Sequence, residues 1–270
     1  MDIAFAADEI YAQYVPAAIE SILQYHPGDS GIRFWIMTTR TGADLIRSRT
    51  EQQASGRASV TILESDESFR SLPVSDDPRL EQITTGMYLK LLLPDAVPSH
   101  VDRLLYLDVD VLCNGSLRDL WDTAIGAAVL AAVVDTGAPT VSSFDGLPGA
   151  PATMRPDDPY FNSGVLLIDV PEWSRQQVTD RCFHYIANLA EPYRFPDQDA
   201  LNIATHQRWF ELDRAWNHMV SFHLSDTEAY RRARIIHFAG PPKPWHANYP
   251  IAELRSRYQA LTRDLAAYRS

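Results

Sequence analysis

The stretch Leu104-Leu105-Tyr106-Leu107-Asp108-Val109-Asp110-Val111-Leu112 places two carboxylates directly after a run of apolar residues. The apolar run predicts a buried β-strand over Arg103–Leu107. Side chains two residues apart in an extended chain point to the same face, so Asp108 and Asp110 would lie side by side. Two unpaired negative charges at the end of a buried strand are energetically costly, and a divalent cation such as Mg²⁺ or Mn²⁺ would offset them. A cation held in this way could also bind a diphosphate. The same spacing also fits carboxylates that only cap the next helix, so the rest of the chain has to decide.

The composition is that of a globular protein with a substantial core. The chain has 270 residues, of which 46% are hydrophobic and 22% are charged. The formal net charge of −11 argues against nucleic acid as a partner, because a basic face that attracts phosphates is not expected in so acidic a chain. An acidic protein that binds a phosphate compound needs local cations, which favours a metal site.

The sequence has no segment that predicts secretion or membrane insertion. Met1–Phe5 lacks a basic region and a long apolar stretch, and the longest mostly apolar run, Ala124–Val134, is too short to cross a bilayer. Two cysteines, Cys113 and Cys182, cannot build a disulfide framework and are expected to be buried thiols in a reducing compartment. We therefore expect a cytoplasmic enzyme.

Predicted strands and helices alternate through the first half of the chain. The alternation indicates an α/β fold with a mainly parallel, twisted central sheet flanked by helices, and ligands bind such sheets at the carboxyl ends of the strands. The acidic residues at or just after predicted strand ends are Asp8, Asp108, Asp110 and Asp135. The strands are expected at Ile3–Ala6, Ile32–Met37, Ser59–Leu63, Arg103–Leu107 and Ala127–Val134, and the helices at 15–23, 43–53 and 88–93, the last one ended by Pro94.

The second half of the chain begins with a long loop. Residues 136–159 contain five prolines and three glycines without periodicity, and such a loop is either a binding loop or a plain surface excursion. No linker or internal repeat follows, so we expect a single domain over residues 1–250. Residues 251–270 carry apolar residues three and four apart, which predicts an amphipathic helical tail. This tail would pack on the domain or make weak peripheral contact with the inner face of a membrane.

A further unusual stretch runs from Arg234 to Trp245. An apolar strand is expected to end at His237, whose neutral imidazole is a good ligand for Mn²⁺ beside two carboxylates. Gly240 would let the backbone approach a phosphate closely, and Lys243 would supply a point charge for it. Taken alone, His237 would more often be a hydrogen-bonded core histidine, so the metal hypothesis depends on both stretches together.

Five motifs occur in an order that is informative as a set. They are Phe5-Ala6-Ala7-Asp8, Leu105-Tyr106-Leu107-Asp108-Val109-Asp110, Tyr160-Phe161-Asn162-Ser163-Gly164, Asp197-Gln198-Asp199, and the spaced residues His237, Gly240, Lys243, Pro244 and Trp245. Together they resemble glycosyltransferase family 8, the family of the bacterial lipooligosaccharide α-galactosyltransferases and of glycogenin. The resemblance extends over nearly the whole chain.

The resemblance implies a GT-A type nucleotide-binding fold. It also implies a retaining, metal-dependent transfer of galactose or glucose from a UDP-sugar to an acceptor hydroxyl on a saccharide or glycoconjugate. The implied cofactor is Mn²⁺, with Mg²⁺ as the alternative, held by Asp108, Asp110 and His237. The cation would act as a Lewis acid on the departing UDP, while Gly240 and Lys243 would grip the diphosphate from the other side.

The rest of the donor site is also implied by the resemblance. Ala6, Ala7 and Asp8 would line the uracil and ribose site, and Tyr11 would stack on the base. Ile10 stands where galactosyltransferase-like members carry a polar residue, often asparagine, so the choice between galactose and glucose stays open. The other donor-binding residues implied are Lys90, Val109, Asp135, Asn162, Ser163, Gly164, Asp197 and Gln198.

The catalytic residues implied are Gln198, Asp197 and Lys90. Gln198 is the residue nearest in role to a nucleophile, but an amide is a poor nucleophile. We therefore expect front-side displacement, in which the acceptor hydroxyl attacks the face that UDP leaves. The leaving phosphate oxygen would take the proton, so no strong base is required.

Two other functions remain open on the sequence alone. The residues around Asp108 and Asp110 also fit the nucleophile motif of haloacid-dehalogenase-type phosphatases, but that motif usually lies near the N-terminus, and about a hundred residues precede it here. The other alternative is a non-catalytic UDP-sugar-binding protein, because a fold does not establish an activity. Retention of all three expected metal ligands argues against it.

Overall fold

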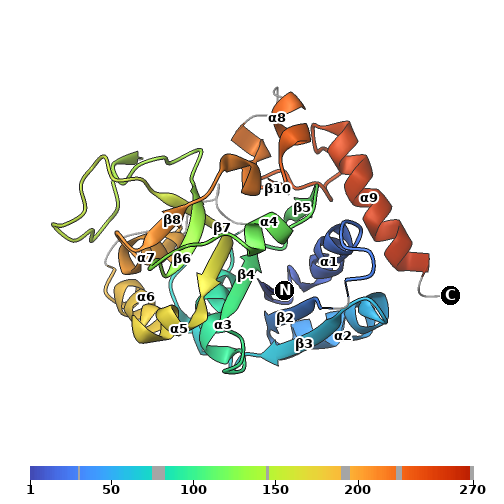
Figure 1. Cartoon of the computed structure of the whole chain (residues 1–270), viewed down its shortest axis with the longest axis horizontal. Coiled ribbons are helices and arrows are strands. Elements are labelled where there is room, and N and C mark those ends of the chain that lie inside the picture. Colours follow the sequence, from blue (N-terminus) through green and yellow to red (C-terminus); the bar gives the residue numbers. More distant parts are fainter. Residues whose placement is uncertain (30, 75–82, 144–145, 190–194, 223–226, 268–270) are drawn as a thin grey trace.

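A seven-stranded sheet forms the centre of the molecule (Figure 1). The computed structural model describes residues 1–29, 31–74, 83–143, 146–189, 195–222 and 227–267. Within them, neighbouring strands of this sheet are parallel except at β7, which runs antiparallel to both β4 and β6. The expected α/β fold with a mainly parallel sheet is therefore confirmed. In spatial order the strands are β3 (Ser59–Glu64), β2 (Arg33–Thr38), β1 (Asp2–Ala7), β4 (Arg103–Leu107), β7 (Phe161–Asp169), β6 (Leu130–Val134) and β8 (Trp209–Glu211).

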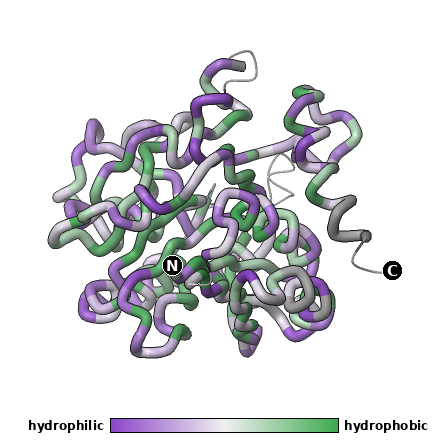
Figure 2. Tube along the Cα trace, turned by 45° about the vertical axis from the view of Figure 1, so that its right-hand side comes forward, coloured by the Kyte–Doolittle hydropathy of each residue, from purple (hydrophilic) through white to green (hydrophobic). Residues whose placement is uncertain are grey.

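Both faces of the sheet are buried, which is why its central strands are apolar on both sides. In β1, Ile3 and Phe5 pack into one core, whereas Ala4 packs into the other. Leu105 and Leu104 of β4 divide in the same way. In Figure 2 hydrophobic segments run through the interior, and hydrophilic ones dominate the outer turns. The first core includes α1 (Val15–Leu23) and α2 (Arg40–Ala54), and the second includes α3 (Leu89–Ala96), α5 (Val170–Arg175), α6 (Val178–Ala187) and α7 (Pro196–Ala204).

A second, three-stranded sheet lies beside the large one and joins distant parts of the chain. Its middle strand, β10, pairs antiparallel with β5 and parallel with β9. The pairing continues past the strand ends, because the Phe238 N–H donates to the carbonyl of Asp110 (2.9 Å). The end of β10 is thus fixed next to the two aspartates that follow β4. The strands are β5 (Val111–Cys113), β9 (His218–Met219) and β10 (Ile235–His237), with the short helices α4 (Arg118–Trp121) and α8 (Thr227–Arg232) nearby in sequence.

Several expected boundaries differ from the structure, and two of these differences have a clear physical cause. Pro94 does not end its helix: α3 continues to Ala96, because Leu93 and Pro94 are both buried and their packing outweighs the one backbone hydrogen bond that proline removes. The strand expected from Ala127 begins at Leu130. Gly126 has a φ of 62°, and the Ala128 N–H donates to the Ile125 carbonyl, so a turn occupies these residues instead.

The stretch 136–159 is a loop, as its composition predicts. Its described residues form turns and bends, with one β-bridge between Thr140 and Pro159. The loop has a small hydrophobic cluster of its own, which includes Val141, Leu147 and Met154. Cys113 and Cys182 are both buried free thiols, as expected, at distant places in the two cores.

The C-terminal helix α9 (Ala252–Ala267) runs beside α1 (Figure 1). Leu254, Tyr258 and Leu261 are buried in a third cluster that also contains Ala17 of α1. The amphipathic helix is present, and these three apolar residues pack on the rest of the chain; Tyr268 lies outside the described residues. A division at residue 250 and a contact of this helix with a membrane stay predictions.

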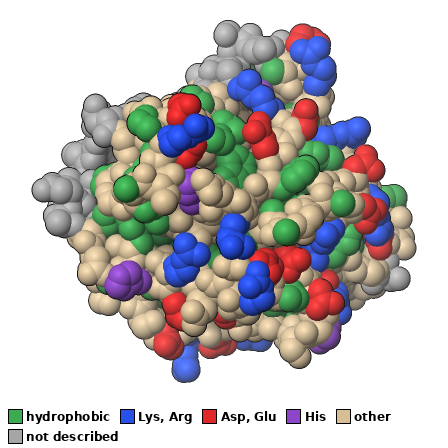
Figure 3. Space-filling model, turned by 60° about the vertical axis from the view of Figure 1, so that its left-hand side comes forward, with side chains coloured by type: hydrophobic (Ala, Val, Ile, Leu, Met, Phe, Trp, Pro, Cys, Tyr) green, Lys and Arg blue, Asp and Glu red, His purple; other side chains and the backbone are tan. Residues whose placement is uncertain are grey.

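Charged side chains of both signs are interspersed on the face shown in Figure 3. No single basic area dominates this face, in keeping with the acidic composition. Among the helices of the described residues, none is both long and apolar enough to cross a bilayer.

Replacement of Leu105 by alanine tests the importance of the central strand. Leu105 is 0% exposed, so L105A should lower the free energy of unfolding by about 3 kcal/mol through lost burial and an unfilled cavity. Urea unfolding followed by circular dichroism measures this. Leu45 on α2 is 45% exposed, so L45A should cost less than about 0.5 kcal/mol. Equal losses in the two variants would contradict the assignment of β4 to the core.

Candidate functional site

Strand ends of the large sheet converge on one cavity of about 410 Å³. Asp8 follows β1, Asp108 follows β4 and Asp135 follows β6, as the sequence predicted. Every residue predicted for the donor site lines this cavity except Gly164. Those lining it are Ala6, Ala7, Asp8, Tyr11, Lys90, Asp108, Val109, Asp110, Asp135, Asn162, Ser163, Asp197, Gln198, His237, Gly240 and Lys243.

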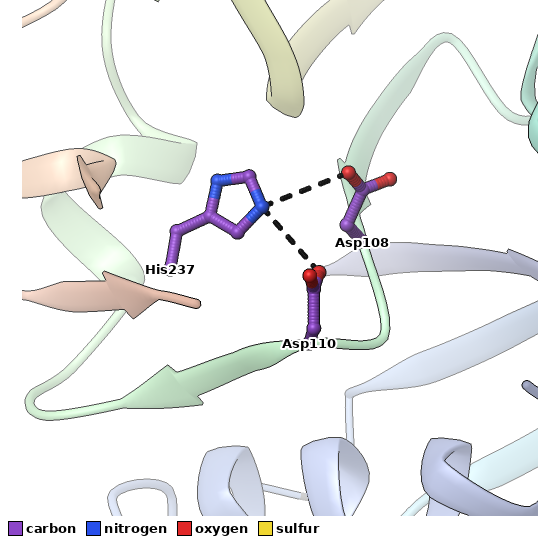
Figure 4. A group of neighbouring side chains, drawn as sticks. All are labelled: Asp108, Asp110 and His237. Carbon is purple, nitrogen blue, oxygen red and sulfur yellow. Dashed lines mark ion pairs between the residues drawn. The ribbon is translucent and has the colours of Figure 1, made fainter. Parts of the chain in front are cut away.

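Asp108, Asp110 and His237 point toward one another from the ends of β4, β5 and β10 (Figure 4). One ligand atom from each lies within 4.8 Å of the others. His237 Nε2 is 3.4 Å from Asp110 Oδ1 and 3.8 Å from Asp108 Oδ2. Two carboxylates and one imidazole form a donor set that suits Mn²⁺ or a similar divalent cation. The residues present therefore fit such an ion.

Lysines pair with both carboxylates. Lys243 Nζ donates to Asp110 Oδ2 and to the Phe238 carbonyl, and Lys90 Nζ lies 3.1 Å from Asp108 Oδ1 and 2.9 Å from Asp197 Oδ2. Burial alone would raise the pKa of Asp110, but Lys243 and His237 outweigh it and hold that pKa well below its ordinary value. Asp110 is thus ionised at neutral pH.

The Lys90 ammonium is held charged by the carboxylates around it. Burial would lower the pKa of Lys90, but Asp108 and Asp197 outweigh it and raise that pKa above its ordinary value. Asp108 Oδ1 accepts from both Lys90 and the Tyr106 hydroxyl, which leaves Oδ2 facing His237. Tyr106 therefore fixes which oxygen of Asp108 is turned toward the cluster.

A network of amide side chains forms another part of the cavity lining. Gln198 Nε2 donates to Asp135 Oδ2 (3.1 Å), and its Oε1 accepts from the Ser163 N–H (3.0 Å). Asn162 Nδ2 donates to Asp135 Oδ2 (3.0 Å) and Gln198 Oε1 (3.1 Å). The Gly164 N–H donates to Asn162 Oδ1 (3.0 Å). Because a backbone N–H is always a donor, these contacts fix the orientation of both amide groups.

Gly164 has no side chain, and the site requires this. A Cβ built there would lie 2.3 Å from His237 Cε1 and 2.8 Å from Nδ1, which is closer than real Cβ contacts. The glycine thus leaves room for the imidazole behind the cavity wall. It was predicted to contact the donor sugar, but the structure places it out of the cavity lining and against His237.

Asp8 is the centre of another part of the cavity lining. Asp8 Oδ1 accepts from the backbone N–H groups of Ile10 and Tyr11, and Oδ2 accepts from the Thr84 hydroxyl. Gly86 lets its backbone approach Asp8, since a Cβ there would lie 2.7 Å from Oδ2. The carboxylate is thus held by groups from two separate segments.

The loop that follows His237 is anchored by aromatic stacking. Trp245 stacks on Tyr14 with ring centroids 3.8 Å apart, and Tyr258 of α9 lies 5.5 Å from Trp245. Tyr11, which was expected to stack on a base, lies edge-on to Trp245 at 6.5 Å. The segment with Gly240 and Lys243 is therefore held between β10 and this aromatic cluster.

Several residues of the site were not predicted from the sequence. Asn217 Oδ1 accepts a hydrogen bond from His237 Nδ1 at 2.9 Å, and Asn217 lies outside every motif, so no sequence pattern points to it. Tyr106 precedes the aspartate pair, and its spacing of two residues from Asp108 could have suggested a contact on the same face. The other lining residues that were missed are Ile83, Thr84, Gly86, Met87, Gly137, Ala138, Phe195, Ala239 and Pro241.

A comparison with protein families gives a match that covers most of the chain. The sequence model of "Glycosyl transferase family 8" matches residues 2–249, which covers the cavity and all its motifs. The chain belongs to glycosyltransferase family 8. It is therefore an enzyme that transfers a hexosyl group, and the phosphatase alternative is set aside.

Three bacterial proteins are similar to this chain over most of its length. General stress protein A of Bacillus subtilis is 25% identical over 97% of this chain and 94% of its own length. Lipopolysaccharide glucosyltransferase WaaO of Escherichia coli is 28% identical over 94% of this chain and 76% of its own length. Lipopolysaccharide 1,3-galactosyltransferase of Salmonella typhimurium is 26% identical over 93% of this chain and 75% of its own length.

A solved structure shares the fold. Galactosyltransferase LgtC, in complex with donor and acceptor sugar analogs, superposes with a TM-score of 0.72 at 26% identity, covering 97% of this chain and 96% of that one. An active-site mutant of LgtC superposes with a TM-score of 0.78 over 98% and 96%. The GT-A type of α/β fold is thereby confirmed.

Substitution of Gly164 tests the close approach to His237. In G164A the new methyl group and the imidazole cannot both keep their places, so unfolding free energy should fall by about 1–3 kcal/mol. A crystal structure of the variant should show a displaced His237 ring. Gly31, where a Cβ meets only the end of the Asp29 side chain at 3.3 Å, gives the control G31A, with an expected change below about 0.5 kcal/mol. A stable G164A with His237 in place would contradict the geometry.

Proposed function

We propose that this enzyme is a retaining, metal-dependent transferase that moves galactose or glucose from a UDP-sugar to a hydroxyl of a saccharide or glycoconjugate. The observation that carries the proposal is the convergence of the Asp108, Asp110 and His237 cluster with the amide network of Asp135, Asn162 and Gln198 in one cavity. The Asp108, Asp110 and His237 cluster suits a metal-bound diphosphate. The amide network offers many hydrogen-bond donors and acceptors to a sugar.

The charge of the cavity favours a donor that arrives with a divalent cation. Aspartates outnumber lysines in its lining, so a bare diphosphate would meet a net negative surface. We propose that Asp108, Asp110 and His237 hold Mn²⁺, with Mg²⁺ as the alternative. When bound, the ion would supply Lewis-acid stabilisation of the negative charge that develops on the leaving diphosphate.

The remaining predicted residues are proposed to hold the donor along the cavity. Ala6, Ala7, Asp8 and Tyr11 lie at the end where the nucleoside would bind. Lys243 and Gly240 would contact the diphosphate, and Lys243 would leave Asp110 to do so. The residues proposed to contact the donor sugar or its nearby phosphate are Lys90, Val109, Asp135, Asn162, Ser163, Asp197 and Gln198.

We propose front-side displacement because of the hydrogen bonds of Gln198. Its Oε1 accepts from both the Ser163 N–H and Asn162 Nδ2, so neither lone pair is free to attack a sugar. In the proposed step the acceptor oxygen bonds to the anomeric carbon while the bond from that carbon to UDP breaks on the same face. The acceptor proton moves to the leaving phosphate oxygen. Gln198, Asp197 and Lys90 would orient the donor and stabilise charge.

The acceptor is proposed to be a saccharide of a bacterial glycoconjugate. Two of the named relatives are lipopolysaccharide glycosyltransferases, and LgtC was solved with an acceptor sugar analog. Gly137 and Ala138, at the start of the 136–159 loop, line the cavity, so this loop is the segment proposed to shape the acceptor site. A cytoplasmic location, with weak contact of α9 at the inner face of a membrane, is the accompanying proposal.

Donor hydrolysis without acceptor tests the donor class. The purified protein with Mn²⁺ should release nucleotide from UDP-galactose or UDP-glucose, but not from GDP- or CMP-sugars, and chelation with EDTA should abolish the release. Chromatography of the free nucleotide measures it. If no UDP-sugar is hydrolysed and UDP does not bind in calorimetry, the proposed donor is wrong.

The substitution D110N tests the proposed metal site. The amide keeps the shape of the side chain but loses its charge, and loss of a metal contact worth several kcal/mol should lower kcat/KM roughly 10²–10³-fold. Steady-state assays over a range of Mn²⁺ concentrations measure this. Asp119 is an exposed acid on α4, so D119N is a matched control that should keep full activity. Wild-type turnover in D110N would overturn the assignment.

A further inference from the structure

The buried amide of Asn217 connects the two halves of the site. Asn217 immediately precedes β9 and is 1% exposed. It is hydrogen-bonded both to the amide network and to the proposed metal cluster. Its Nδ2 donates to Asn162 Oδ1 (2.9 Å), and its Oδ1 lies 2.9 Å from His237 Nδ1. The asparagine therefore stands between the amide network and the imidazole of the proposed metal cluster.

The direction of these hydrogen bonds follows from fixed backbone donors. The Gly164 N–H donates to Asn162 Oδ1, so this atom is an acceptor and the Asn217 atom facing it must be the NH₂ group. Asn217 Oδ1 then faces His237 and can only accept. The neutral imidazole must consequently carry its proton on Nδ1, which leaves the lone pair of Nε2 facing Asp108 and Asp110.

We propose that Asn217 is a positioning residue that fixes the tautomer and ring orientation of His237 so that Nε2 is the metal ligand. A metal-bound histidine generally donates a hydrogen bond from its other ring N–H to such a partner. The partner raises the basicity of the nitrogen that binds the metal. Loss of a partner of this kind typically weakens metal affinity 10–100-fold. The inference rests on the proposed metal site and adds to it a residue that is not part of the cavity lining.

The first experiment reads the tautomer in the metal-free wild-type protein at a pH where the ring is neutral. A long-range ¹H–¹⁵N spectrum distinguishes the two ring nitrogens, and the signals of His237 are identified by their loss in H237Q. The proton should be on Nδ1. A proton on Nε2 would overturn the inference, and no substitution at position 217 is needed for this result.

The second experiment measures Mn²⁺ affinity without donor, from the electron paramagnetic resonance signal of the free ion. In N217L the side chain fills similar space but cannot accept a hydrogen bond, so the dissociation constant should rise about 10–100-fold. N217D keeps an acceptor oxygen toward Nδ1 but replaces the NH₂ donor to Asn162 Oδ1 with a second oxygen, so it should bind Mn²⁺ more tightly than N217L and more weakly than wild type. Asn114, whose amide donates to the Ala233 carbonyl at the other end of the same small sheet, gives the control N114A, with unchanged affinity expected.

The outcomes separate this inference from the proposed function. Tight binding by wild type with unchanged binding by N217L would overturn the role of Asn217 alone. Wild-type protein that binds no Mn²⁺ would overturn the proposed metal site together with this inference.

Discussion

Concentrated negative charge at the carboxyl edge of the central sheet is the constraint on which the site depends. The topology brings Asp8, Asp108 and Asp135 to one edge because each follows a strand of the same sheet. Buried carboxylates are stable only when they are paired or hydrogen-bonded. Here Lys90 and Lys243 supply charge, and backbone N–H groups supply hydrogen bonds. The same electrostatic requirement makes the edge a suitable place for a cation and a phosphate donor.

The hydrogen bonds of the site form a continuous chain with a fixed direction. It begins at Asp135, which can only accept, and passes through Asn162 and Asn217 to His237. The Gly164 N–H sets the orientation of Asn162 and, through it, that of Asn217, and the Ser163 N–H sets the orientation of Gln198 beside them. A buried network in which each member has a defined partner is rigid, and rigidity of this kind places groups for catalysis before a substrate arrives.

Much of this arrangement was predictable from local sequence. Strand ends are marked by a change from apolar to acidic residues, so Asp8, Asp108 and Asp135 were placed correctly at the edge of the sheet. Pro94 was misjudged because tertiary burial outweighed a local rule. Asn217 was missed because its role depends on the pairing of β9 with β10, and no spacing along the chain encodes which distant strand a short segment will join.

The sequence by itself determined the alternation of strands and helices, the family resemblance and the identity of the charged groups. These properties follow from patterns that repeat every two or nearly four residues, and from motifs that are contiguous. Only the tertiary structure decided that Gly164 makes room for His237 and that Asn217 orients it. Such relations depend on distances between segments far apart in the chain. Those distances are set by strand pairing and core packing together, so no single stretch of sequence contains them.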